Sequence, residues 1–131
     1  MPILFDTGAL ELLRRRDRQA EKLAIDFFPP LICPAVLGEF LYGQLLADVS
    51  SSSLLEAQEF LGAFDVQHPD SSTALIYARL RSDQKRHGIV LPDPDFWIAA
   101  HAIQMNWPLA STDTDFQHFD DVRLYLLPGR R

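Results

Sequence analysis

The chain has 131 residues, of which 47% are hydrophobic and 23% are charged, and its formal net charge is −6. These values predict one folded domain over residues 1–131 with a substantial core, and they argue against non-specific attraction of nucleic acid by a bulk positive field. No apolar run approaches membrane-spanning length, and Asp6 would interrupt the apolar part of a signal peptide, so a cytoplasmic protein without membrane association is expected.

Short apolar runs alternate with helix-forming segments along the chain. Strands are predicted at residues 2–5, 31–34, 63–67, 109–110 and 122–126. Helices are predicted at residues 8–16, 18–28, 35–47, 54–62 and 72–87, and from Asp93-Pro94 to Met105. Serines 50–53 are expected to form a loop and to cap the helix at residues 54–62. In the last helix, Asp93 is expected to be the cap and Pro94 to occupy the first turn. This alternation predicts an α/β fold with a parallel sheet flanked by helices.

Four acidic residues stand at predicted strand ends or helix starts: Asp6, Glu39, Asp95 and Asp113. Each alone has an ordinary explanation, such as capping a helix or closing a turn. In an open α/β fold, however, ligands bind at the carboxyl ends of the strands, so these side chains are expected to converge. Clustered carboxylates repel one another unless a hard cation lies between them, and oxygen ligands suit Mg²⁺ or Mn²⁺. The joint placement predicts a metal-dependent hydrolase.

Four segments resemble the signature segments of PIN-domain proteins, and in particular the VapC-type ribonuclease toxins of prokaryotic type II toxin–antitoxin pairs. They are FDTGAL at 5–10, VLGEFLYG at 36–43, DPDFWIAAHA at 93–102 and STDTDF at 111–116. Their order and spacing fit over essentially the whole chain. The resemblance implies a three-layer α/β/α fold with a central, mainly parallel sheet, and an acidic pocket that binds Mg²⁺ or Mn²⁺.

The resemblance also implies roles for individual residues. The catalytic and metal-binding acids would be Asp6, Glu39, Asp95 and Asp113. Asp115 is close enough to share or take the role of Asp113, and Asp93 is kept as the helix cap and as a candidate outer-shell ligand. The supporting hydroxyls would be those of Thr7 and Ser111. One departure is Gly8, which stands where the family commonly has asparagine and so removes a polar group near the pocket.

The implied activity is hydrolysis of RNA phosphodiesters by a water activated at the metal. The implied partners are RNA, an antitoxin protein and a second copy of the chain. Phosphate contacts are expected from Arg14, Arg15, Lys85 and Arg86. An antitoxin groove could be lined by apolar residues of the second signature segment and the positions after it, of which some must belong to the core: Leu37, Phe40, Leu41, Tyr42, Leu45 and Leu46.

Other functions are open at this point. A catalytically silent PIN-like module that binds RNA or protein would be favoured if one of the four acids were missing, and all four are present. An aspartic protease of the retropepsin type is suggested by the AspThrGly motif at residues 6–8, and it predicts an all-β chain. A zinc enzyme is disfavoured, because His68, His87, His101 and His118 lack ligand spacing among themselves or with Cys33. We expect His101 and Cys33 to be buried in the core.

Overall fold

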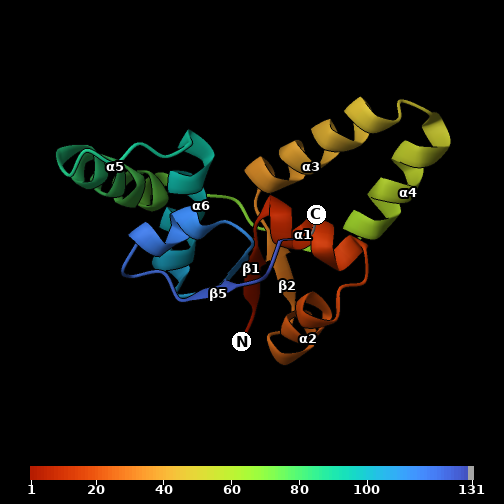
Figure 1. Cartoon of the computed structure of the whole chain (residues 1–131), viewed down its shortest axis with the longest axis horizontal. Helices are drawn as coiled ribbons and strands as arrows, with labels where there is room; N and C mark the ends of the chain where they lie inside the picture. The colour runs from red at the N-terminus through yellow and green to blue at the C-terminus, as the bar shows by residue number, and fades with distance from the viewer. Residues whose placement is uncertain (130–131) are drawn as a thin grey trace.

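The computed structural model describes residues 1–129 and has three layers, with helices on both faces of a parallel sheet (Figure 1). The strands lie side by side in the order β3-β2-β1-β4-β5, and every pairing is parallel. Their bounds are β1 (Ile3–Phe5), β2 (Pro30–Ile32), β3 (Asp65–Val66), β4 (Leu109–Ser111) and β5 (Leu124–Leu126). The predicted α/β/α fold is confirmed, and the all-β protease is excluded.

The helices also agree with the sequence prediction in number and order. They are α1 (Thr7–Arg14), α2 (Arg18–Asp26), α3 (Pro34–Ala47), α4 (Ser51–Leu61), α5 (Ser71–Arg86), α6 (Asp93–Met105) and the short 3-10 helix η1 (Thr114–His118), which was not predicted. The serine run differs from the prediction, because Ser50 alone caps α4 and the next three serines form its first turn.

The start of α6 corrects the prediction for Asp93. The cap position is Pro92, which makes no side-chain capping bond, and Asp93 is the first residue of the helix. One Asp93 carboxylate oxygen accepts hydrogen bonds from Arg81, at 2.7 Å, and from the Tyr77 hydroxyl. Asp93 therefore ties α6 to α5, and its negative charge suits the first turn of a helix.

The middle of the sheet is fully buried. Ile3, Leu4 and Phe5 of β1 and both apolar residues of β4 have no exposed surface, as expected for parallel strands covered on both faces. Cys33 and His101 are also buried, in agreement with the prediction. The residues that directly follow β1 and β4 are thus held by a tightly packed core.

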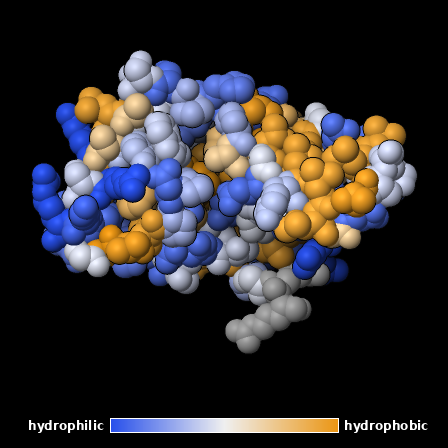
Figure 2. All heavy atoms as spheres, turned by 90° about the horizontal axis from the view of Figure 1, so that it is seen from above, coloured by the Kyte–Doolittle hydropathy of each residue, from blue (hydrophilic) through white to orange (hydrophobic). Residues whose placement is uncertain are grey.

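Helices α3 and α4 form a projecting arm with an apolar surface (Figures 1 and 2). On α3, Phe40 is a core residue, whereas Tyr42 and Leu46 are 65% and 71% exposed. Leu37 and Leu41 are partly buried against the core, and Leu45 is exposed. The predicted groove residues therefore divide between core and surface. None of the helices within residues 1–129 is long and apolar enough to cross a membrane.

Candidate metal centre

The four predicted acids line one pocket of about 150 Å³ at the carboxyl edge of the sheet. Asp6 directly follows β1, and Asp113 lies two residues beyond β4, its parallel neighbour. Glu39 reaches the pocket from α3 and Asp95 from the first turn of α6. The remaining lining residues are Thr7, Gly8, Ile98 and Thr112. Parallel pairing of β1 with β4 is what brings acids more than 100 positions apart into one site.

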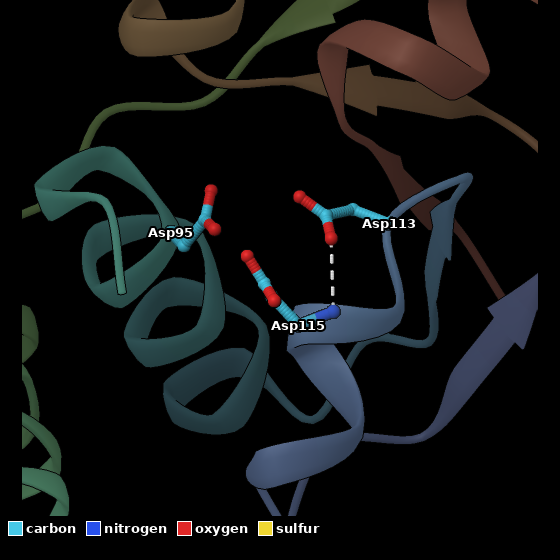
Figure 3. Close-up of side chains that lie close together, drawn as sticks. All are labelled: Asp95, Asp113 and Asp115. Carbon is cyan, nitrogen blue, oxygen red and sulfur yellow. Dashed lines mark hydrogen bonds between the residues drawn. The ribbon is translucent and has the colours of Figure 1, made fainter. Parts of the chain in front are cut away.

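Three carboxylates come closest together. Asp95, Asp113 and Asp115 each place an oxygen within 4.8 Å of the others (Figure 3). The backbone N–H of Asp115 donates to Asp113 Oδ1 at 2.9 Å, which fixes the turn that opens η1. Carboxylate oxygens are the ligands that a hard divalent cation such as Mg²⁺ prefers. Small side-chain movements would therefore let these three groups share one ion.

Asp95 is a partly buried acid with one unsatisfied oxygen. Its Oδ2 is buried and has no hydrogen-bond partner among residues 1–129. Burial, followed by the negative charges of Asp113 and Asp115, raises the pKa of Asp95 to about 7. A divalent cation would satisfy this oxygen and offset the repulsion. The residues present thus fit a hard divalent cation.

Asp6 is more deeply buried, with 6% of its surface exposed. Its Oδ1 accepts the backbone N–H of Ala9 at 2.8 Å and caps α1, while its Oδ2 accepts the hydroxyl of Ser111. Burial raises the pKa of Asp6 to about 6, the two hydrogen bonds oppose this rise, and the charges of Asp113 and Glu39 add to it. Asp6 is therefore both a helix cap and a member of the acidic pocket.

The supporting hydroxyls occupy two different places. Ser111 is completely buried; its hydroxyl donates to Asp6 and accepts the backbone N–H of Asp113 at 2.9 Å. Thr7 donates to Glu39 Oε1 at 3.0 Å and so links α1 to α3. Glu39 lines the pocket but lies outside the group of three close aspartates.

Other predicted residues lie apart from the pocket. Asp93 points to α5, and Lys85 and Arg86 lie in the last turn of that helix. Arg14 and Arg15 line a separate groove between α1 and α3, where the Arg14 guanidinium lies 5.3 Å from the centre of the Phe40 ring.

Two pocket residues were missed by the sequence analysis, Ile98 and Thr112. The signal for Thr112 was its place between Ser111 and Asp113, on the loop that leaves β4. The signal for Ile98 was its place three residues after Asp95, on the same side of α6.

The solved structures of several proteins share this fold. VapBC2 from Rickettsia felis, bound to a DNA fragment from their promoter, is 20% identical, with a TM-score of 0.82 over 97% of this chain and 99% of the other. VapBC-1 from nontypeable Haemophilus influenzae is 21% identical, with a TM-score of 0.83 over 96% and 98%. FitAcB from Neisseria gonorrhoeae is 24% identical, with a TM-score of 0.77 over 94% and 96%.

These likenesses concern the fold, because identity is below 25% in each case. Among curated proteins, none matches the chain significantly in sequence. The family model of the PIN domain, in contrast, matches residues 3–122, which is most of the chain. The chain belongs to the PIN domain family.

Proposed function

We propose that the chain is a single-domain, Mg²⁺- or Mn²⁺-dependent endoribonuclease of the VapC type, the toxin of a toxin–antitoxin pair. The observation that carries the proposal is the group formed by Asp95, Asp113 and Asp115, together with the buried Oδ2 of Asp95, which has no hydrogen-bond partner among residues 1–129. An apolar or neutral ligand would leave the repulsion among these three carboxylates in place. Membership of the PIN family supports a nuclease over other metal-dependent hydrolases.

In this proposal Asp95 and Asp113 hold the ion, Asp115 shares the position with Asp113, and Asp6 and Glu39 complete the acidic wall. A divalent cation at this place supplies a water of lowered pKa and offsets charge on the phosphate. The protein orients the ligands: Ser111 fixes the Asp6 carboxylate, and the Asp115 backbone N–H fixes that of Asp113. Asp93 pairs with Arg81 and is given no role at the metal.

Ser111→Ala is expected to weaken binding of Mn²⁺ by about tenfold or more, since groups that orient metal ligands typically contribute this much. The variant loses the hydrogen bond that lowers the pKa of Asp6, so that pKa should rise further. Isothermal titration with Mn²⁺ measures the affinity. Ser82→Ala is the matched control, because Ser82 is an exposed residue of α5 whose hydroxyl donates to a backbone carbonyl. Equal Mn²⁺ affinity in wild type and Ser111→Ala would contradict the orienting role.

Partners are part of the proposal. The similar structures include VapBC toxin–antitoxin complexes, and the exposed Tyr42, Leu45 and Leu46 of α3 offer an apolar surface of the kind that a partner covers. We propose an antitoxin on the α3–α4 arm, and a homodimer as the working assembly. Arg14 and Arg15, in the groove beside α3, and Lys85 and Arg86, on α5, are proposed to contact RNA phosphates.

The activity is tested by incubating purified, antitoxin-free protein with total cellular RNA in Mg²⁺, Mn²⁺ or EDTA, and with single-stranded DNA in parallel. The expected result is RNA cleavage that requires the cation. Cleavage that persists in EDTA would overturn the metal mechanism. A folded protein that leaves RNA intact under all conditions but binds it would instead favour the catalytically silent module.

A further inference from the structure

Thr112 and Gly8 occupy one space on the wall of the acidic pocket. A Cβ built on Gly8 would overlap the hydroxyl oxygen of Thr112 and would lie 3.3 Å from its Cβ. The two residues come from different elements: Gly8 is in the first turn of α1, and Thr112 is on the loop between β4 and η1. The absence of a side chain at position 8 is therefore what lets the Thr112 side chain stand at the pocket.

The Thr112 hydroxyl is uncommitted. Within residues 1–129 it has no hydrogen-bond partner, whereas the nearby Thr7 and Ser111 hydroxyls each donate to a carboxylate. It is also not sealed from solvent, since Thr112 is only partly buried and its oxygen is not among the enclosed unpaired atoms. Of the side chains that line the pocket, Thr112 is thus the one with a hydrogen-bond donor left over for a ligand.

A donor at this place has a defined use. The other polar side chains of the pocket are four carboxylates and the occupied Thr7 hydroxyl. Ionised carboxylates only accept hydrogen bonds, so they cannot bind a phosphate oxygen directly. A hydroxyl can donate to that oxygen, and hydrogen bonds to charged acceptors are stronger than neutral ones.

We propose that the Thr112 hydroxyl donates a hydrogen bond to a non-bridging oxygen of the phosphodiester bound in the pocket, and that Gly8 is glycine to admit it. The inference rests on the proposed ribonuclease function and adds a residue that contacts the substrate. It also explains the departure at position 8: the polar group that an asparagine would supply from α1 comes here from the adjacent Thr112, on the loop between β4 and η1.

The proposal is tested with Thr112→Val, which keeps the shape but removes the donor, and Thr112→Ser, which keeps the donor. Cleavage of a fluorescein-labelled single-stranded RNA is measured in Mg²⁺. Binding of the same RNA is measured by anisotropy with Ca²⁺ in place of Mg²⁺. Thr114→Val is the matched control, because Thr114 is exposed on η1 and does not line the pocket.

Thr112→Val should lower kcat/KM by about tenfold or more and weaken RNA binding, with Mn²⁺ affinity unchanged. Thr112→Ser should keep kcat/KM within about threefold of the wild-type value, and Thr114→Val should match wild type. Full activity in Thr112→Val, or equal loss in the Val and Ser variants, would overturn the proposal. Wild-type protein that neither binds nor cleaves RNA would overturn both this proposal and the proposed function. That failure is distinguishable, because it is seen in the wild-type protein before any variant is compared.

The second part of the proposal, that position 8 must be glycine to admit the Thr112 side chain, can be tested without RNA. Gly8→Ala should lower the melting temperature in the wild-type background, because the new Cβ displaces Thr112. In a Thr112→Gly background the same substitution should be neutral or stabilising, as alanine is favoured in a helix. Equal effects of Gly8→Ala in the two backgrounds would show that the two positions are not coupled.

Discussion

Asp95→Asn is expected to lower the rate of RNA cleavage by about a thousandfold or more, the largest effect of any single substitution considered. The substitution preserves size but removes one negative charge from the group formed with Asp113 and Asp115. The metal-free variant should also melt at a higher temperature than wild type, because a partly buried, unpartnered carboxylate and its repulsion are gone. Loss of activity with gain of stability separates a functional role from a structural one.

Asp93→Asn is the matched control for this experiment. It makes the same chemical change two positions earlier in α6, at an exposed residue that is paired with Arg81 and lies outside the pocket. Exposed ion pairs contribute about 0–1 kcal/mol to stability, so this variant should fold normally and keep wild-type activity. Equal loss of cleavage in both variants would contradict the assignment of Asp95, and wild-type cleavage by Asp95→Asn would refute it.

In EDTA, the stability of the protein is expected to fall as the pH rises from 4 to 8. The folded-state pKa values of Asp6 and Asp95, about 6 and about 7, are both raised above the ordinary aspartate pKa of 3.8. Between these values the folded state binds more protons than the unfolded state, so raising the pH favours unfolding. The contribution of Asp6 and Asp95 to stability is fully present below about pH 4 and is lost progressively up to about pH 7, and the part due to the half-exposed Asp95 is reduced by solvent screening.

A divalent cation should reverse this loss at the higher pH, where the carboxylates are ionised and free to bind it. At a Mn²⁺ concentration one hundred times Kd, the gain is about 2.7 kcal/mol, or about 10 °C in melting temperature for a domain of this size. Differential scanning fluorimetry at pH 5 and pH 8, with Mn²⁺ or EDTA, measures both effects. In Asp95→Asn the pH slope and the Mn²⁺ response should both shrink. A wild-type response to Mn²⁺ that is larger at pH 5 would contradict the account.

Much of the fold was predictable because the local signals agree. The fully apolar runs at residues 2–5 and 109–110 predict strands buried on both faces, and β1 and β4 are central in the sheet. The acids just beyond their carboxyl ends were expected to meet, since parallel strands end at the same edge of the sheet. Convergence of Asp6 and Asp113 therefore follows from topology, without knowledge of side-chain positions.

The details of the acidic site depend on tertiary geometry that local patterns do not contain. The candidate metal roles of Asp93 and Asp115 rested on their places beside the signature acids, yet Asp93 turns to Tyr77 and Arg81 on α5, whereas Asp115 is brought beside Asp95 by η1. Capping preference favoured Asp93 as the N-cap of α6, but the N-cap is Pro92 and Asp93 is the first residue of the helix, where it pairs with Arg81. The Thr112 hydroxyl lies where a Cβ on Gly8 would be, although the two positions are 104 residues apart. No periodicity in the sequence indicates this proximity.

The most direct test of the metal centre is an anomalous difference map from crystals of the wild-type protein grown or soaked with Mn²⁺ at pH 8. We expect a peak in the pocket, in contact with carboxylate oxygens of Asp95 and of Asp113 or Asp115. The peak should be absent from Asp95→Asn crystals and present in those of Asp93→Asn. A wild-type map without a peak at these three aspartates, at a pH where they are ionised, would contradict the claim that the cluster is a metal centre.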